Sequence, residues 1–548
     1  MYRKTTRLLS VASIAFAAMP ILVGSRAANA TDVTVDLTAT KQMIRGFGAS
    51  SAWCGTVSTS VMDSLYKDLG YSILRVRIEE GIGDSWSSGN FSAWAPELAN
   101  AKNAVARGAI VFASPWNPPA SMKSGGKLMT SKYADYASYL KAYAKYFSDN
   151  GAPLFAVSIQ NEPDYAATWT AWTATDLLTF LTGQGATLSS AIKVIMPESF
   201  QFIHAMSDPS LNDATAASYI SIIGGHLYGG KIQDYPLARN QGKELWETEH
   251  YFDDDTIANI MKMATEIHDC MVTGYMNAYV YWWITYGNGL ATSSGTIFKR
   301  AYVLGQFAKH IRPGYYRVDA TANPATNVSV SAYRGEDKVV VVAVNSGTAS
   351  VNQNFVLGSG TGAQISSWQT TADSNMTAGQ TYQVSGGAFT AALPAQSITT
   401  FVGTSNTPIG GLDGGAGGVA GDAGTRASGG SSGSGGLSGA GGTSGTGGAT
   451  VSEAGGSLGS GGRAGTGGSS SSSSSSNGSG GASTTTTSNT AAGGSGGSSS
   501  GGTATTGTSS SGCSCALAGR RRGADAHSLA YLLVLCGLVL ARRRTSAR

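Results

Sequence analysis

The sequence predicts an α/β fold, a (β/α)8 barrel carrying an antiparallel β-sandwich side domain. Three observations lead to this prediction. A short apolar run alternates eight times with a longer segment of helical spacing between Ile44 and Ile284. After Pro313 the spacing changes to an alternation of apolar and polar residues. Neither end of the chain has a sequence that we expect to fold into a core. Roughly 31–404 therefore remains as the folded part.

The eight expected barrel strands are separated by helix-like stretches such as Tyr133–Phe147 and Asp255–Cys270. Eight such units within 44–312 fit a closed barrel. An open, doubly wound sheet is the alternative, but the sequence contains no glycine-rich dinucleotide fingerprint. In chain order the expected strands are IRGFGAS, ILRVRI, AIVFASPW, LFAVSIQNEP, IKVIMPES, ISIIGGHLY, ELWETEH and AYVYWWI.

The segment 313–404 contains runs such as KVVVVAVNSG and SITTFVG, with turn residues between them. Alternating apolar and polar residues are typical of antiparallel strands with one buried face. Before the barrel, the stretch VTVDL (Val33–Leu37), within 31–43, could pair as an additional strand of this side domain. In that case the two domains would form one rigid unit.

The two ends of the chain differ in composition from the part expected to fold. Residues 1–30 combine a basic start, an apolar run and a small-residue ending, which indicates a secretory signal peptide. Residues 405–511 consist almost wholly of Gly, Ser, Thr and Ala, which predicts a flexible tether. The sequence therefore predicts a secreted protein.

The tail, 512–548, contains Cys513, a 13-residue apolar run (Leu529–Ala541) and an arginine cluster. As a helix this run would measure about 20 Å, which is short of a membrane core of about 30 Å. The tail resembles the myxobacterial C-terminal sorting tag, which implies processing near Cys513 and attachment at the cell surface. The alternative is a plain, short membrane anchor.

Charge and cysteine usage narrow the possible functions. The whole chain has a formal net charge of +4, but acidic residues outnumber basic ones within 31–404. This balance argues against a nucleic-acid partner. Cys54 and Cys270 fall near opposite ends of the expected barrel, so we expect both thiols to be unpaired.

Two carboxylates lie at the carboxyl ends of the expected strands, where a barrel of this kind carries its catalytic residues. Glu162 follows Asn161 at the end of the fourth strand, and Glu249 ends the seventh. Glycoside hydrolysis needs such a pair, one protonated to assist the leaving oxygen and one ionised. A separation of about 5–5.5 Å would give retention of configuration through a covalent intermediate.

Several sequence motifs point to one family of glycoside hydrolases. They are GFGASSAW, SPWNPPASMK, Asn-Glu-Pro, Trp-x-Thr-Glu and RPGYYRVDATANP. From about 32 to 402 the chain resembles glycoside hydrolase family 30, in its bacterial glucuronoxylanase branch. The resemblance implies that Glu162 is the acid/base and Glu249 the nucleophile of an endo-β-1,4-xylanase. Beside them, we expect Asn161 to bond the sugar 2-hydroxyl and Tyr228 to bond the nucleophile carboxylate.

Other polar residues near these strand ends have two possible interpretations. Arg77, on the second strand, could keep the nucleophile ionised or form a buried structural pair. His226, like Tyr228, could support the site or pack in the core. Glu247 precedes Glu249 by two residues, so we expect it on the same interior face, one layer deeper and structural in role.

Aromatic residues are frequent at the same strand ends. Sugar rings have apolar C–H faces that stack on such side chains. A period of two means that not all of them face the cleft, and we expect Trp53, Trp116 and Trp282 to point inward. The candidate substrate contacts are Trp53, Trp116, Tyr165, Tyr251, Trp282 and Tyr286, with Trp283 the member expected to point outward.

The chain departs from the branch it resembles in the loop after the eighth strand. Where the branch has arginines that bind a glucuronic acid side group, this chain reads WWITYGNG (Trp282–Gly289). The acidic run Asp253–Asp255 in the adjacent loop would repel a uronate. We therefore expect a xylanase without strict dependence on glucuronate. Alternatively, another decorated xylan or short oligomers are preferred, or Lys231 or Lys243 supplies the cation.

Two further classes remain open from the sequence. One is a β-1,6-glucanase or β-glucosidase-like member of the wider family, and the other is a non-catalytic surface carbohydrate-binding protein. The presence of both Glu162 and Glu249 argues against a pure binder. No cluster with metal-ligand spacing is visible, so we expect neither metal nor cofactor, and we expect a monomer.

Overall fold

The computed structural model describes residues 30–165, 169–335 and 337–406. The predicted signal peptide (apart from residue 30), the linker beyond residue 406 and the C-terminal tail lie outside these residues. Within the described residues, no helix has the length and apolarity needed to cross a membrane. Cys54 and Cys270 form no disulfide within the described part of the chain, as expected.

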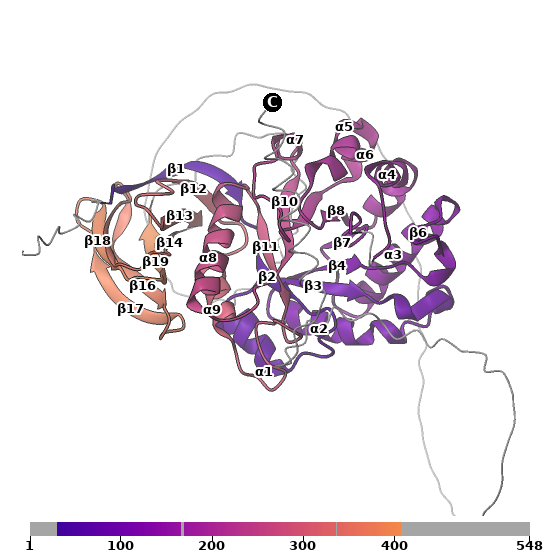
Figure 1. Cartoon of the computed structure of the whole chain (residues 1–548), viewed down its shortest axis with the longest axis horizontal. Coiled ribbons are helices and arrows are strands. Elements are labelled where there is room, and N and C mark those ends of the chain that lie inside the picture. The colour runs from indigo at the N-terminus through magenta and orange to yellow at the C-terminus, as the bar shows by residue number, and fades with distance from the viewer. Residues whose placement is uncertain (1–29, 166–168, 336, 407–548) are drawn as a thin grey trace, which may run out of the picture. The chain divides into compact units, whose positions relative to one another are not determined.

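Eight parallel strands close into the predicted barrel, and each lies within one of the eight predicted runs (Figure 1). Seven of these strands contribute to one apolar cluster that fills the barrel interior, with Phe112 and Trp246 as its largest side chains. Around the barrel the strands are β2 (Gly46–Ser50), β3 (Ile73–Ile78), β4 (Ile110–Pro115), β7 (Ala156–Ser158), β8 (Lys193–Ser199), β9 (Ile222–His226), β10 (Glu244–His250) and β11 (Ala278–Trp283).

Helices surround the barrel, and their apolar spacing explains which faces are buried. In α3, Tyr136, Leu140, Tyr143 and Phe147 recur every three or four residues and are all buried. The helix α4 begins with a capping box in which Thr173 and Asp176 bond each other's backbone N–H groups. The helices are α1 (Thr59–Met62), α2 (Ala95–Val105), α3 (Tyr133–Asp149), α4 (Ala174–Ser189), α5 (Asp208–Asn212), α6 (Ala214–Tyr219), α7 (Pro236–Arg239), α8 (Ile257–Val272) and α9 (Lys299–Ala308).

Short elements lie in the loops between these units. A two-stranded hairpin of β5 (Lys123–Ser124) and β6 (Lys127–Leu128) follows β4. A π-helical segment, Asp63–Asp68, continues α1. The 3-10 segments are Glu80–Ser88, Ser92–Trp94, Ala120–Met122, Thr130–Lys132 and His204–Met206.

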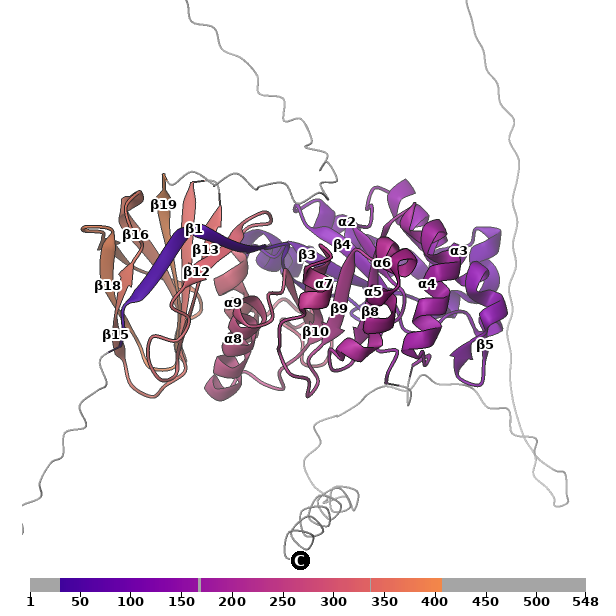
Figure 2. The same ribbon diagram turned by 90° about the horizontal axis from the view of Figure 1, so that it is seen from above.

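The side domain is a mostly antiparallel sheet that folds over on itself (Figure 2). The rings of Phe355 and Phe401 lie 5.0 Å apart although their strands are not neighbours in the sheet, so two layers enclose one apolar core. The strand order is β17 (Thr377–Gln383), β16 (Thr361–Thr370), β19 (Ser397–Ser405), β14 (Lys338–Asn345), β13 (Val328–Gly335), β12 (Tyr316–Ala320), β1 (Val33–Met43), β15 (Val351–Val356) and β18 (Ala388–Leu393).

The strand β1 ties the chain's first described residues to this domain. It pairs antiparallel with β12 and, at Val33 and Thr34, parallel with β15. On the barrel side, side chains of β13 and β14 belong to the same apolar cluster as those of α8 and α9. The amine of Lys299 donates to the carbonyls of Thr371 and Ser374, at 2.9 and 3.1 Å. The side domain therefore braces the helices that follow β10 and β11.

Candidate active site

The two candidate catalytic carboxylates lie at the carboxyl ends of β7 and β10, as the sequence predicts. Glu162 is 5% exposed and Glu249 is 4% exposed. One oxygen of each, together with a nitrogen of His226, forms a group of atoms within 4.8 Å of one another. This spacing matches the short separation of a nucleophile and an acid/base acting on one anomeric carbon, rather than the wider gap that admits a water between them.

Glu249 is surrounded by donors that favour its ionised form. The guanidinium of Arg75 donates to Oε2 at 2.5 Å, and the Tyr228 hydroxyl donates to Oε1 at 2.9 Å. Burial and, to a smaller extent, the charge of Glu162 raise the pKa of Glu249 above its usual value, although His226 and Arg75 oppose this rise. When Glu162 holds a proton, its repulsion of Glu249 disappears, and the two cations then favour the ionised form that attacks.

Glu162 has different partners. The indole N–H of Trp169 donates to Oε2 at 2.8 Å, and Nδ1 of His226 lies 3.0 Å from Oε1. Although burial lowers the pKa of His226, the carboxylates Glu249, Glu162 and Glu198 raise it to about 10. At neutral pH the ring is therefore a cation that donates to Glu162. His226 thus contacts the site directly, and Trp169 is a contact that the sequence did not reveal.

Arg75 is at the centre of the site, a role for which the sequence suggested Arg77. Arg75 is fully buried and also donates to Asn161 Oδ1 at 2.6 Å. Its guanidinium carbon lies 4.7 Å from the Trp116 ring centroid, within cation–π range. Arg77 pairs instead with Glu79 and Glu80, so the interpretation of Arg77 as the partner of the nucleophile is wrong.

The two arginines differ in their depth along β3, which explains why Arg75 and not Arg77 reaches the nucleophile. Arg75 and Arg77 share one parity on β3, so a period of two cannot separate them. Arg75, one layer deeper, reaches across the barrel to Glu249. Arg77 lies higher, with its guanidinium carbon 4.4 Å from the Trp53 ring centroid.

Asn161 is fully buried beside the acid. Its oxygen accepts from Arg75, and its Nδ2 atom has no hydrogen-bond partner among the described residues. A buried amide N–H without a partner is costly, which makes it an available donor for a substrate hydroxyl. This arrangement is compatible with the expected contact to the sugar 2-hydroxyl.

Glu247 has the structural surroundings expected of it, but on the other face of β10. Trp246 belongs to the interior cluster, whereas Tyr279, which pairs opposite Glu247, belongs to the outer one. Register shifts on both sides of β10 after Glu247 mark a β-bulge, which turns Glu249 inward. The Glu247 carboxylate accepts from the N–H groups of Glu249 and Val280, at 2.8 and 3.1 Å. The expectation of a shared interior face is therefore wrong.

One wall of the mouth is made of tryptophans. Trp53, Trp116 and Trp282 form one cluster, as the sequence predicts, with ring centroids 4.9 to 5.8 Å apart. Trp169 stacks on Trp53 with ring centroids 6.2 Å apart. Through its N–H group, Trp169 connects this wall to Glu162.

Tyrosines and their neighbours form a second wall, which meets the tryptophan wall where the ring centroids of Trp282 and Trp283 lie 4.7 Å apart. Tyr165, 37% exposed, stacks on Phe200, which in turn stacks on Tyr228. Tyr251 lies 5.6 Å from Tyr228 and 6.5 Å from Trp283, measured between ring centroids. The contacts continue from Trp283 to Tyr286, which is 43% exposed. Trp283 thus joins this wall instead of pointing away from it.

The ligand atoms of Glu162, His226 and Glu249 are close enough to hold a metal ion. However, Arg75 and Tyr228 already bond Glu249, and Trp169 and His226 bond Glu162. A guanidinium donating to the same carboxylate disfavours a second cation there. The donor set fits acid–base work better than metal binding.

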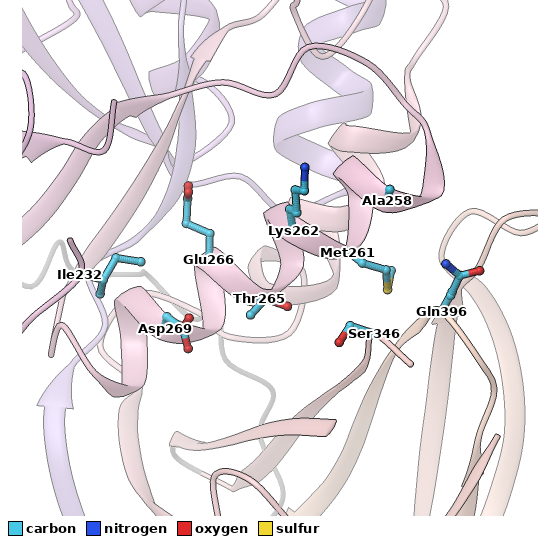
Figure 3. A pocket seen from close by; sticks show the side chains of 9 residues that line it. All are labelled: Ile232, Ala258, Met261, Lys262, Thr265, Glu266, Asp269, Ser346 and Gln396. Atoms are coloured by element: carbon cyan, nitrogen blue, oxygen red, sulfur yellow. The ribbon is translucent and has the colours of Figure 1, made fainter. Parts of the chain in front are cut away.

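A separate hollow of about 530 Å³ lies on the outer side of α8 (Figure 3). Side chains of α8, including Lys262 and Thr265, line it together with Ser346 and Gln396 from the side domain. No aromatic side chain is among the described residues that line it. It therefore lacks the stacking surfaces found around Glu162 and Glu249.

Comparison with known proteins agrees with this geometry. The profile described as glycosyl hydrolase family 59 matches residues 90–322. The glucuronoxylanase XynC of Bacillus subtilis (strain 168) is 40% identical over 430 residues, which span 73% of this chain and 99% of that protein. A second Bacillus subtilis XynC is 42% identical over 398 residues, 68% of this chain and 92% of the relative.

Solved structures identify the family more precisely. The GH30 endoxylanase from Clostridium papyrosolvens C71 is 62% identical, with a TM-score of 0.67, and covers 68% of this chain and all of its own. Xyn30A from Clostridium acetobutylicum, a family 30 subfamily 8 xylanase, is 54% identical with the same TM-score and the same coverage. These matches are longer than the family 59 match and include both domains. The chain belongs to glycoside hydrolase family 30 and is a glycosyl hydrolase.

Proposed function

We propose that this protein is a secreted, retaining endo-β-1,4-xylanase that does not strictly depend on glucuronic acid side groups. One observation carries the mechanism: a carboxylate oxygen of Glu162 and one of Glu249 lie within 4.8 Å of each other. Glu249 would attack the anomeric carbon while Glu162 protonates the leaving oxygen. Glu162 would then take a proton from water, and the hydroxyl would release the sugar from Glu249.

The two aromatic walls support a polymeric substrate. Both groups of aromatic rings adjoin the carboxylates, the tryptophans through Trp169 and the tyrosines through Tyr228, so sugars bound beyond the cleaved bond would have rings to stack on. The relatives with long matches are named xylanases and glucuronoxylanases, which supports xylan as the polymer.

The loop after β11 supports the relaxed side-group requirement. Two cationic residues follow it, and both are engaged. The amine of Lys299 donates to the carbonyls of Thr371 and Ser374, and Arg300 is 5% exposed with its Nε 3.4 Å from Asp255. Asn288 of this loop donates to Asp253, at 3.4 Å. A uronate entering here would meet a carboxylate and an engaged guanidinium. Lys243 is excluded as the missing cation, because its amine donates to the carbonyls of Ala217 and Ile220.

Product analysis of the full-length chain tests this function. Glucuronoxylan, arabinoxylan and unbranched xylo-oligomers are digested in parallel. We expect all three to be cut, with no fixed distance between the cleaved bond and a glucuronate branch. Cleavage of glucuronoxylan alone, at one fixed position, would instead assign the uronate contact to another residue such as the exposed Lys231. Cleavage of a β-1,6-glucan and of no xylan would overturn the substrate class.

Export and surface attachment are part of the same proposal. The basic and apolar start of the chain, the Gly/Ser-rich linker and the Cys513 tail support a catalytic domain held outside the cell on a tether. Fractionation of cells that make the full chain, followed by mass spectrometry of the C-terminus, tests this. Recovery of the intact tail in the cytoplasm would contradict it.

A further inference from the structure

A third carboxylate, Glu198 at the end of β8, lies beside the two cationic side chains of the site. It is fully buried, so it offers no surface to a sugar. Its Oε1 lies 3.1 Å from Nη2 of Arg75 and 3.9 Å from Nε2 of His226. Its backbone carbonyl accepts from the N–H group of Glu162 at 3.0 Å. Glu198 therefore contacts both cations of the site and the backbone of the acid.

Each of the two cations serves more than one carboxylate. Arg75 donates to Glu249 and to Glu198 through different nitrogens. His226 lies 3.0 Å from Glu162 through Nδ1, and its Nε2 is 3.9 Å from both Glu198 and Glu249. Three carboxyl groups and two cationic side chains thus form one buried group, in which an unbalanced charge would be destabilising.

The proposed double displacement moves one negative charge inside this group. At the start Glu249 is ionised and Glu162 is protonated. When Glu249 forms the bond to the anomeric carbon, the glycosidic bond breaks and the proton of Glu162 passes to the leaving oxygen. Glu249 is then a neutral ester and Glu162 a carboxylate, so the total charge of the two is −1 before and after.

We propose that Glu198 is a positioning residue, a fixed counter-ion that keeps this buried group neutral while the charge moves between Glu249 and Glu162. Arg75 and His226 contribute +2. The moving charge contributes −1, and Glu198 contributes the remaining −1 in every state. Without Glu198, the group would carry an excess positive charge, which would favour loss of a proton from the acid.

The surroundings of Glu198 agree with a permanent charge. Burial by itself would raise the pKa of this carboxyl, but Arg75, His226 and Ser158 lower it to about 2. The ionisable groups that face it are Arg75 from β3 and His226 from β9. These two cations in turn contact Glu249 from β10 and Glu162 after β7. Asp164, two residues after Glu162, accepts instead from the Ser199 hydroxyl and from the N–H group of Phe200.

This inference rests on the proposed double displacement, and Glu198→Gln tests it in the full-length chain. Because one negative charge is removed from beside Arg75 and His226, the cations that contact both catalysts, we expect both limbs of the pH profile of kcat/KM to move about one pH unit lower. Glu198→Asp, which keeps the charge, should retain the wild-type limbs even if kcat falls. Unshifted limbs in a folded Glu198→Gln variant would overturn the proposal.

A matched control is Glu244→Gln, the same change at the opposite end of a barrel strand, where the carboxylate pairs with Arg45. We expect the control to lose some thermal stability and to leave both limbs in place. A shift of the same size in the control would mean that any lost carboxylate moves the profile, which contradicts a specific role for Glu198.

A second measurement, on the wild type, needs no substrate. Nitrogen NMR of the six histidines, with His226 assigned through His226→Asn, reports whether this ring is charged. We expect an imidazolium from pH 5 to 8. A neutral His226 at pH 7 would remove one of the two positive charges and overturn the charge balance. If xylan is not cut but His226 is charged, the failure lies in the proposed substrate.

Discussion

The surroundings of Glu249 and of Glu162 differ, although both carboxylates are buried in one mouth. Glu249 bonds a guanidinium and a phenol, from Arg75 and Tyr228. Glu162 bonds an indole and an imidazolium, from Trp169 and His226. A guanidinium does not lose its proton, so it favours a carboxylate that begins the reaction ionised. An indole donor tolerates either state of an acid that must give and regain a proton.

Replacing the two catalytic carboxylates has the largest expected effect and distinguishes the nucleophile from the acid/base. Glu249→Gln should lose at least about 10⁴-fold in kcat on any glycoside, because no nucleophile remains. Glu162→Gln should lose about 10²–10⁴-fold on xylan, because general acid assistance contributes that much. On an aryl xylobioside with an acidic leaving group, Glu162→Gln should lose far less in kcat/KM, because the first displacement then needs little acid assistance, although the second step still lacks its base. Equal losses for both variants on both substrates would contradict the assignment.

The next effect tests the guanidinium beside Glu249. Arg75→Lys keeps the charge but cannot bond Glu249, Glu198 and Asn161 together, so we expect kcat to fall about 10²-fold. Arg77→Lys, two residues along the same strand, is the control and should cost much less. A larger loss in the Arg77 variant would indicate that Arg77, and not Arg75, supports the nucleophile, which would contradict the contacts in the structure.

A smaller effect tests the phenol. Tyr228→Phe removes one hydrogen bond to an ionised carboxylate, a contact worth about 1.5–3 kcal/mol, so we expect kcat to fall at least about 10-fold. The acid limb of the pH profile should rise, because Glu249 loses a donor that favours its charged form. Tyr286→Phe, at an exposed ring, is the control for general disturbance of the tyrosine wall. An unchanged acid limb in Tyr228→Phe would argue against this support of the nucleophile.

The smallest effect concerns the residue behind the nucleophile. Burial, and secondly the charge of Glu266, raise the pKa of Glu247 well above its usual value. A carboxyl whose pKa is raised in the folded state contributes stability below the unfolded value of 4.5, and this contribution is lost as pH rises through the folded value. Glu247→Gln cannot ionise.

The melting temperature of Glu247→Gln relative to wild type should therefore increase between pH 4 and pH 8. Each pKa unit traversed corresponds to about 1.4 kcal/mol. A constant difference across this range would contradict the raised pKa. Activity should change little, because the Gln oxygen can still accept the N–H group of Glu249.

The sequence predicted the parts of the molecule that depend on periodicity and on strand ends. Eight runs gave the eight barrel strands, and Glu162 and Glu249 followed from their positions at two of those ends. The same filter applied to the fifth run, IKVIMPES, would have included Glu198. That residue was missed because a third carboxylate has no part in the two-carboxylate scheme.

Other parts depend on details that a period of two cannot express. Arg75 and Arg77 share a face, and only the depth of β3 in the barrel decides which one reaches Glu249. The bulge in β10 reverses the face of Glu247, and nothing in ELWETEH marks it. Trp169 lies in a loop rather than at a strand end, so its contact with Glu162 required the three-dimensional structure.

The anomeric configuration of the first product tests the central claim most directly. Proton NMR during hydrolysis of a xylo-oligomer by the full-length chain distinguishes the β-anomer from the α-anomer before mutarotation mixes them. Two carboxylates with oxygens within 4.8 Å of each other, acting by double displacement, predict that the β-anomer forms first. If the α-anomer forms first, the reaction inverts configuration, and Glu249 is not the nucleophile.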